Sequence, residues 1–267
     1  MRAAAFDYAR PESLAEALEL LAEHGDDARP LAGGQSLLPL MALRLARPAL
    51  LVDLQRLPEL RALEVSPGTL RIGAMTTESE LESVPALPPI LASALPQIGH
   101  FQIRNRGTVG GSLAHMDPAG EWPALALLLD AELEVASARG GRRIGAAEFC
   151  RGPLTTALEA DELLLAVKLR HAGGPHGFAE VARRPGDFAL VGAACHAGRI
   201  VAFATGHGPQ RLAGCERHLA QGGGLDELQA LAETEIEAAG DVHVSAAYRR
   251  RMGARLVARV VQACISG

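Results

Sequence analysis

Residues 104–121 constrain the chain most, because this segment concentrates glycines and small hydroxyl side chains. Three glycines, Thr108 and Ser112 fall within residues 107–112. Glycine permits sharp bends and close approach of the backbone to a ligand. Successive exposed N–H groups form a concave anion site, and small hydroxyl side chains add donors. The segment predicts a diphosphate site, although a tight loop between packed elements is the commoner meaning of one Gly-Gly pair.

A second glycine segment, G-G-Q-S-L at residues 33–37, strengthens the prediction of an anion site. A short strand is expected at residues 29–32, and a helix is expected to begin at Ser36. A strand, a Gly-Gly turn and a helix start would bring free N–H groups and a helix dipole to one point, which favours phosphate. The motifs G-x-G-x-x-G and G-x-x-x-x-G-K are both absent, so the usual nucleotide folds are not supported.

Length and composition predict a globular protein of two unequal domains. The chain has 267 residues, of which 48% are hydrophobic and 21% charged, and its net charge is −5. An acidic balance argues against nucleic-acid binding, which needs a basic surface. No apolar run approaches the ~18 residues of a membrane span, and the first residues do not resemble a secretory signal. We expect a soluble, cytoplasmic protein.

The four cysteines predict buried thiols rather than a metal site. Cys150, Cys195, Cys215 and Cys264 lie far apart, and none belongs to a C-x-x-C pair or has a histidine beside it at ligand spacing. An iron–sulfur cluster in any familiar spacing is therefore not expected on this chain.

Local signals predict a mixture of helices and strands. Capping boxes at residues 13–16 and 77–80 predict helix starts, and the first helix should stop at Gly25. Further helices are expected at about 89–98 and from Trp122. The expected strands are 49–53, 61–65, 70–74, 131–137, 142–146 and 162–169, of which 61–74 and 131–146 form hairpins.

The segment H-A-G-G-P at residues 171–175 reads as a linker, so we place a domain boundary there. Beyond it, three strands are expected at 177–184, 188–196 and 200–205, and helices at 211–220, 225–239 and 245–265. The last helix carries Arg249, Arg250, Arg251, Arg255 and Arg259. A basic face of this kind can dock a partner, but solvated arginine is its commoner meaning.

Four motifs in the chain resemble one protein family. They are L-A-G-G-Q-S-L-L-P-L-M-A-L-R-L-A-R-P (31–48), I-R-N-R-G-T-V-G-G-S-L-A-H-M-D-P-A-G-E-W-P (103–123), A-R-R-P-G-D-F-A-L-V-G (182–192) and S-A-A-Y-R-R-R-M (245–252). Together they are similar to the FAD-binding medium subunit of molybdenum hydroxylases, including carbon monoxide dehydrogenase and the xanthine dehydrogenase family. The likeness runs through nearly the whole chain.

The resemblance implies an α+β fold. A two-subdomain FAD-binding domain of the vanillyl-alcohol oxidase/MurB-like (PCMH) type would occupy residues 1–171, with subdomains at about 1–56 and 57–171. A small C-terminal domain of the carbon monoxide dehydrogenase flavoprotein type, with a three-stranded antiparallel sheet and helices, would occupy residues 176–267. FAD would lie between the two subdomains.

The resemblance also implies which residues bind FAD, and it assigns neither a catalytic residue nor a metal ligand to this chain. Glu121 would accept hydrogen bonds from flavin-side hydroxyls. Leu164, or its neighbour Leu163, would place backbone near the isoalloxazine. The full expected set is Ala32, Gly33, Gly34, Gln35, Ser36, Leu37, Thr108, Val109, Gly110, Gly111, Ser112, Glu121, Leu164, Glu180 and Asp187.

Two positions depart from the family pattern. Many relatives carry a lysine where this chain has Glu180, so the electronic environment of the flavin is expected to differ. Phe188 keeps an aromatic ring but lacks the hydroxyl of a tyrosine found in some members. Asp187 is expected either to cap a turn or to act beside the flavin. His115 and Asp117 are expected to shape their loop rather than to form an acid–base pair.

The predicted function is that of a FAD-containing electron-transfer subunit of a heterotrimeric molybdenum hydroxylase. Electrons would come from iron–sulfur clusters of a small partner subunit and leave to an external acceptor, with NAD, a quinone and oxygen as alternatives. A large partner would hold the molybdenum cofactor, and the complex would be a dimer of heterotrimers. The alternatives are a self-sufficient flavin-dependent oxidoreductase of the same fold and a nucleotide-binding module without redox activity.

Overall fold

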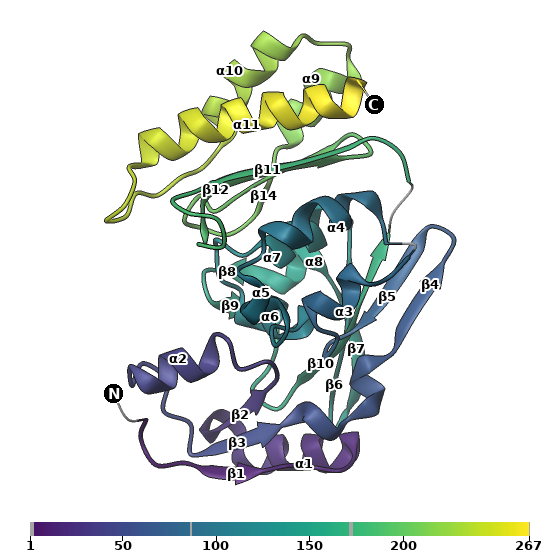
Figure 1. Ribbon diagram of the computed structural model, residues 1–267, viewed down its shortest axis with the longest axis vertical. Helices are drawn as coiled ribbons and strands as arrows, with labels where there is room; N and C mark the ends of the chain where they lie inside the picture. Colours follow the sequence, from purple (N-terminus) through teal and green to yellow (C-terminus); the bar gives the residue numbers. More distant parts are fainter. Residues whose placement is uncertain (1–2, 86, 171–172, 267) are drawn as a thin grey trace.

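The computed structural model describes residues 3–85, 87–170 and 173–266. Its secondary structure is arranged in three layers along the long axis of the molecule (Figure 1). The N-terminal layer lies at one end, a larger layer of sheet and helices lies in the middle, and the C-terminal sheet with its helices lies at the other end. The mixed α and β architecture agrees with the predicted fold class.

The N-terminal layer is a parallel sheet in the order β1-β3-β2, packed on one helix. Its elements are β1 (Asp7–Ala9), α1 (Leu14–His24), β2 (Ala28–Leu31), α2 (Leu37–Ala42) and β3 (Leu50–Asp53). The Ser13 hydroxyl accepts the N–H of Glu16 and Gly25 ends α1, as predicted. The Glu16 carboxylate, however, accepts the N–H of Glu12 at 2.8 Å, one residue before the expected partner, so only half of this capping box is confirmed.

The middle layer is built on an antiparallel sheet in the order β4-β5-β10-β6-β7. Its strands are β4 (Leu63–Ser66), β5 (Thr69–Gly73), β6 (Glu132–Ser137), β7 (Gly140–Gly145) and β10 (Leu163–Arg170). Both predicted hairpins are confirmed. The last strand, β10, inserts between them, which joins two sequence-local units into one sheet.

Several short helices cover this sheet. They are α3 (Glu78–Glu82), α4 (Pro89–Ala94), α5 (Phe101–Arg104), α6 (Val109–His115), α7 (Glu121–Leu128) and α8 (Ala146–Phe149), with a small hairpin of β8 (Cys150–Gly152) and β9 (Thr155–Thr156) after them. The capping box before α3 is formed in full. Helix α7 is apolar all round and almost wholly buried, with Trp122 fully inaccessible, as expected for a helix inside a core.

The C-terminal layer has a sheet of four strands, so the prediction of a three-stranded sheet was wrong. The strands are β11 (His176–Ala182), β12 (Ala189–His196), β13 (Arg199–Phe203) and β14 (Gln210–Arg211), paired in that order. Strand β14 is too short and polar to show a strand pattern in the sequence. It forms because Arg211 and Gln210 pair with Val201 and Ala202 of β13, a contact that only the tertiary fold provides.

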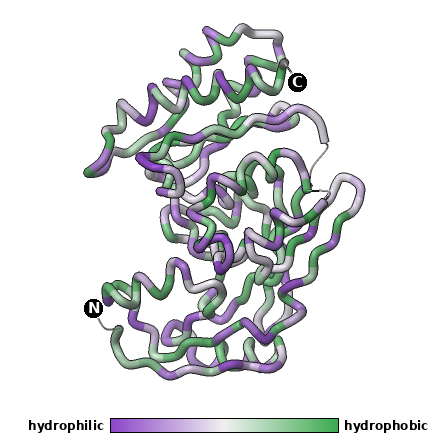
Figure 2. Tube along the Cα trace, in the orientation of Figure 1, coloured by the Kyte–Doolittle hydropathy of each residue, from purple (hydrophilic) through white to green (hydrophobic). Residues whose placement is uncertain are grey.

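Three helices cover one face of this sheet (Figure 1): α9 (Ala213–Ala220), α10 (Leu225–Glu235) and α11 (Ala246–Ser266). Apolar and polar residues alternate along α11 in Figure 2, and its apolar side packs on the sheet. Gly177 permits this close contact, because a Cβ there would lie 2.4 Å from the carbonyl oxygen of Val260. The prediction of solvated arginines on α11 is wrong for Arg249, which is only 7% exposed.

Residues 171–172 of the predicted linker, and residue 267 at the predicted end of the second domain, lie outside the described residues. The proposed boundaries at 171 and 176, and at about 56 between subdomains, stay predictions. Of the four cysteines, Cys195 and Cys215 are buried, whereas Cys150 and Cys264 are half-buried. Among the helices described, none combines the length and the apolar character needed to cross a membrane.

Candidate cofactor-binding site

A large cavity of about 730 Å³ lies where the three layers meet. The N-terminal layer contributes Pro30 and the second glycine segment, the middle layer contributes residues of α3, α5, α6 and α7, and the C-terminal layer contributes Gly186, Asp187 and Phe188. The volume falls within the range of small-molecule and cofactor sites. We call it the large cavity.

The two glycine segments meet at this cavity. A Cβ on Gly33 would lie 2.0 Å from the carbonyl oxygen of Arg106, and one on Gly111 would lie 3.5 Å from the Cβ of Ala32. Backbone therefore lies directly against backbone, which only glycine allows at Gly33. Segments more than 70 residues apart in the sequence thus form one wall, as expected if both serve one ligand.

The segment at 107–112 does not present the exposed N–H groups that the sequence predicted. It forms the start of α6, and among the described residues all but one of its N–H groups have protein acceptors: Val109 donates to Thr76 at 3.0 Å, Gly110 to Ala74 at 2.9 Å and Gly111 to the Thr108 hydroxyl oxygen at 3.1 Å. The exception is the N–H of Thr108. Gly110 serves close packing instead, because a Cβ there would lie 2.4 Å from that of Ala74. This side of the cavity offers close approach and the half-buried Ser112 hydroxyl rather than a set of backbone donors.

The other glycine segment does offer backbone donors. The N–H groups of Gly33, Gly34, Gln35 and Ser36 have no protein acceptor among the residues that the structure describes. Gly34 has φ +74°, a conformation that side chains disfavour, and the Gln35 amide donates to the Gly33 carbonyl oxygen at 3.0 Å, which stabilises the turn. Gly33, Gln35 and Ser36 line the cavity, and unpaired N–H groups so close together are suited to the oxygens of a diphosphate.

Glu121 lines the large cavity from the first residue of α7 and is 4% exposed. Burial raises the pKa of its carboxyl to about 7, and the nearby charge of Asp117 acts in the same direction. A carboxyl group at this position can accept hydrogen bonds from ligand hydroxyls when ionised, or donate one when neutral.

Glu78 is a cavity residue that the sequence reasoning missed. It is 3% exposed, its Oε2 has no hydrogen-bond partner among the described residues, and burial together with the charge of Glu121 raises its pKa to about 8. The capping box at 77–80 placed Glu78 at a helix start. Its burial could not be seen from that local pattern, because it depends on contact with residues of α5 and α7.

Nine of the expected site residues line the large cavity, and six do not. Those on its wall are Gly33, Gln35, Ser36, Leu37, Thr108, Gly111, Ser112, Glu121 and Asp187. Those outside the wall are Ala32, Gly34, Val109, Gly110, Leu164 and Glu180. Leu164 is 5% exposed and belongs to the hydrophobic core. Glu180 belongs to β11, and the charge of Glu121 acts on its carboxyl group.

The other wall residues were not in the expected set, although Gly107 belongs to the glycine segment at 107–112. They are Asp26, Arg29, Pro30, Glu78, Ile98, Gly99, His100, Ile103, Gly107, Ala114, His115, Asp117, Gly120, Leu154, Thr155, Thr156, Leu158, Glu159, Ala160, Glu162, Gly186 and Phe188. Asp117 shapes its loop, as predicted, by accepting the N–H of Ala119 at 2.8 Å. Phe188 is 61% exposed, so its ring can contact a ligand without disturbing the core.

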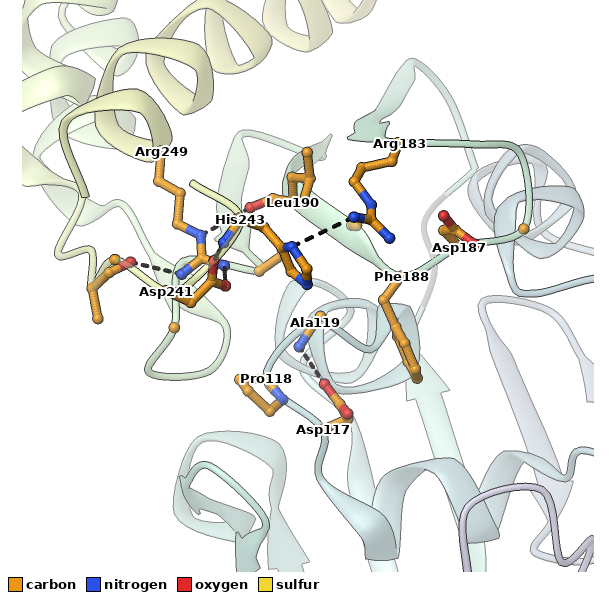
Figure 3. A pocket seen from close by; sticks show the side chains of 16 residues that line it. Asp117, Pro118, Ala119, Arg183, Asp187, Phe188, Leu190, Asp241, His243 and Arg249 are labelled. Atoms are coloured by element: carbon orange, nitrogen blue, oxygen red, sulfur yellow. Dashed lines mark hydrogen bonds and ion pairs between the residues drawn. The ribbon is translucent and has the colours of Figure 1, made fainter. Parts of the chain in front are cut away.

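A second cavity of about 640 Å³ adjoins the large one and shares Asp117, Gly186, Asp187 and Phe188 with it. In Figure 3, Arg183 and His243 face each other across it, 3.5 Å apart. Arg249 lies at its base and donates to Leu190, Ala239 and Asp241 (Figure 3). These three acceptors explain why an arginine on the expected basic face is buried.

Comparisons with known proteins agree with the resemblance seen in the motifs. The model of the FAD binding domain in molybdopterin dehydrogenase matches residues 4–170. The nicotine 6-hydroxylase medium subunit of Paenarthrobacter nicotinovorans is 40% identical, and the match covers 98% of each chain. The carbon monoxide dehydrogenase medium chain of Hydrogenophaga pseudoflava is 36% identical, over 97% of this chain and 96% of its own.

Solved structures support the same assignment. A chain in the crystal structure of quinoline 2-oxidoreductase from Pseudomonas putida 86 matches with a TM-score of 0.92 and 36% identity, covering 100% of this chain and 99% of that chain. The shared fold and the family match are independent of the cavity geometry described above. The chain belongs to the family of FAD-binding oxidoreductase subunits of the molybdopterin dehydrogenases.

Proposed function

We propose that the large cavity binds FAD and that the chain is the electron-transfer subunit of a heterotrimeric molybdenum hydroxylase. The observation that carries the proposal is that Gly33, Gln35 and Ser36, whose N–H groups have no acceptor among the described residues, line a cavity of about 730 Å³ in a chain of this family. These donors would hold the diphosphate. When bound, FAD supplies an electron carrier that accepts and donates electrons one or two at a time.

The remaining expected residues would orient the cofactor. Ser112 would donate from the α6 side, where Gly111 leaves room for close approach. Glu121 would bind ligand hydroxyls, and Phe188 would cover the cofactor from the C-terminal layer, where it separates the large cavity from the second cavity. Some expected residues do not line the cavity and would help only by fixing the backbone shape of its wall: Ala32, Gly34, Val109 and Gly110. Leu164 would support the wall from the hydrophobic core.

The partners follow from the family. The names of similar proteins include medium subunits of nicotine 6-hydroxylase and of carbon monoxide dehydrogenase, which implies complexes of several chains. We propose a large molybdenum-binding partner and a small iron–sulfur partner, joined in a dimer of heterotrimers. The small partner would deliver electrons to this chain, which would pass them to an external acceptor, and the complex would lie in the cytoplasm.

The test is an absorption spectrum of the protein purified from its native host, with identification of the chains that co-purify. Flavin bands together with a large molybdenum chain and a small iron–sulfur chain would support the proposal. A yellow single chain that a small donor reduces would favour a self-sufficient oxidoreductase instead. A colourless chain whose melting temperature does not rise when FAD is added would contradict FAD binding, because a ligand at 100 times its Kd stabilises by about 2.7 kcal/mol.

A further inference from the structure

Two carboxyl groups of the middle layer, Glu78 of α3 and Glu121 of α7, line the large cavity, and Glu180 of β11 in the C-terminal layer lies close enough to Glu121 to be affected by its charge. We call these three groups the carboxyl row. The charge of Glu121 acts on both Glu78 and Glu180. The Oε2 atoms of Glu78 and Glu180 are buried and have no hydrogen-bond partner among the described residues. An ionised carboxylate at a buried position is costly, because burial removes its charge from solvent.

Glu78 sits directly beside the first turn of α6. Its N–H donates to the Gly107 carbonyl oxygen at 3.2 Å, and a Cβ added to Gly107 would lie 2.3 Å from its Oε2. Both residues line the large cavity. The absence of a side chain at Gly107 thus makes room for the carboxyl group on the wall that the proposed diphosphate would face.

The charged groups around the row do not neutralise it. Arg104 of α5 favours the ionised form of Glu78, but it is paired with Glu82 at 2.8 Å between Nε and Oε1, and it donates to the carbonyl oxygens of Ile98 and Gly99. The indole of Trp122 also favours the ionised form, although its N–H has no formed hydrogen bond. Asp117 adds negative charge beside Glu121.

The remaining titratable groups on the cavity wall are mixed in sign. They are Asp26, Arg29, His100, His115, Glu159, Glu162 and Asp187. Glu159 and Glu162 are ion-paired with Arg139 and Arg142, so they add little net charge. The wall therefore holds few unpaired cations to offset a dianionic diphosphate.

We propose that Glu78 is a FAD-binding residue that acts as a neutral carboxylic acid, and that the carboxyl row takes up a proton from solvent when FAD binds. The protonated carboxyl donates its O–H to the cofactor, whereas an ionised one repels the diphosphate. Glu121 and Glu180 help to keep the row protonated, because a negative charge on one carboxyl group disfavours ionisation of the next. The inference rests on the proposed placement of FAD in the large cavity.

FAD affinity is expected to fall as pH rises. Burial raises the pKa of Glu78 and of Glu180 to about 8 and that of Glu121 to about 7. As pH rises through this range the row loses protons, so FAD binding must recapture a proton and weakens. Affinity then falls by up to about tenfold per pH unit for each proton taken up.

The experiment measures FAD affinity for the FAD-depleted full chain by quenching of flavin fluorescence from pH 7.5 to 9.5. We expect wild-type affinity to fall at least about tenfold. Glu78→Gln keeps a neutral donor, so its FAD affinity should fall much less over this pH range. At pH 9.5 it should bind FAD more tightly than wild type. Glu64→Gln, on the exposed strand β4, is the matched control and should follow wild type.

Calorimetry of the wild-type chain tests the same proposal without a variant. FAD titrations at pH 8 in two buffers of different ionisation enthalpy should show net uptake of a proton. Three outcomes would overturn the inference while leaving FAD binding intact. They are a wild-type FAD affinity that changes less than about twofold between pH 7.5 and 9.5, no proton uptake on binding, and an FAD affinity of Glu78→Gln that falls with pH as steeply as that of wild type. Failure to bind FAD at every pH would instead contradict the proposed function.

Discussion

The Gly33 Cα and the Arg106 carbonyl oxygen are so close that a Cβ on Gly33 would lie 2.0 Å from that oxygen. The contact holds the two glycine segments together at the wall of the large cavity. Gly33→Ala must separate them, so we expect a loss of about 1–3 kcal/mol in unfolding free energy and at least tenfold weaker FAD binding. Thermal melts with and without FAD, and a fluorescence titration, measure both effects.

Gly145→Ala is the control for that substitution. No atom lies within 4 Å of a Cβ at Gly145, and its φ of −69° suits any residue. This variant should stay within about 0.5 kcal/mol of wild type and bind FAD normally. Equal effects of the two substitutions would show that the contact between Gly33 and Arg106 has no special role.

Stability of the FAD-free protein should fall as pH rises from about 5 to 9. The pKa values of Glu78 and Glu180 are about 8 in the folded chain, against 4.5 when exposed, because burial disfavours their charged forms. Between these values the folded chain binds more protons than the unfolded chain, so each added pH unit destabilises it. We expect a decrease of roughly 2–4 °C in Tm per pH unit for each group that ionises.

The Glu78→Gln variant should flatten that decrease and melt above wild type at pH 9, because an amide cannot ionise. Differential scanning calorimetry at intervals from pH 5 to 9 provides the comparison, with Glu64→Gln as the control. A wild-type Tm that is constant or rises over this range would contradict the assignment of neutral carboxyl groups.

Arg249 should be required for the stability of the C-terminal layer. It is 7% exposed and donates to Leu190 at 3.0 Å and to Ala239 and Asp241 at 2.6 Å. Arg249→Met would leave these acceptors without a donor, at an expected cost of about 2–4 kcal/mol. Arg251→Met removes an exposed arginine from the same helix and should be near neutral. Urea unfolding of the two variants distinguishes a structural arginine from a solvated one.

The ion pair of Arg142 and Glu162 predicts a loss of stability in acid. Arg142 donates to Glu162 at 2.7 Å and lowers its pKa. The stabilisation is present above the unfolded pKa of about 4.5 and is lost as pH falls through the lower folded pKa. Arg142→Met should lower the free energy of unfolding at pH 7, and the difference from wild type should shrink progressively below pH 4. A difference between variant and wild type that persists unchanged in acid would show that the arginine stabilises the fold through contacts other than the ion pair, such as its hydrogen bond to the Ala157 carbonyl oxygen at 2.8 Å.

Local interactions explain the secondary structure that the sequence predicted. The start of α1 at Ser13, the capping box at Thr77 and the two hairpins of the middle sheet all depend on residues a few positions apart, so their signals are complete within short windows. The family motifs were recognised for the same reason. Strand β14 was missed because its pairing with β13, and not its own pattern, makes it a strand.

The sequence by itself determined that the chain has glycine segments typical of an anion site and motifs of one flavoprotein family. Tertiary structure decided what each residue does there. Gly110 packs against Ala74 instead of exposing its N–H, while Gly33 to Ser36 keep theirs unpaired. Glu78 and Arg249 are buried and Glu180 is half-buried, and the covering elements are distant in the sequence. Burial and hydrogen-bond satisfaction are properties of contacts across the fold, so no local pattern contains them.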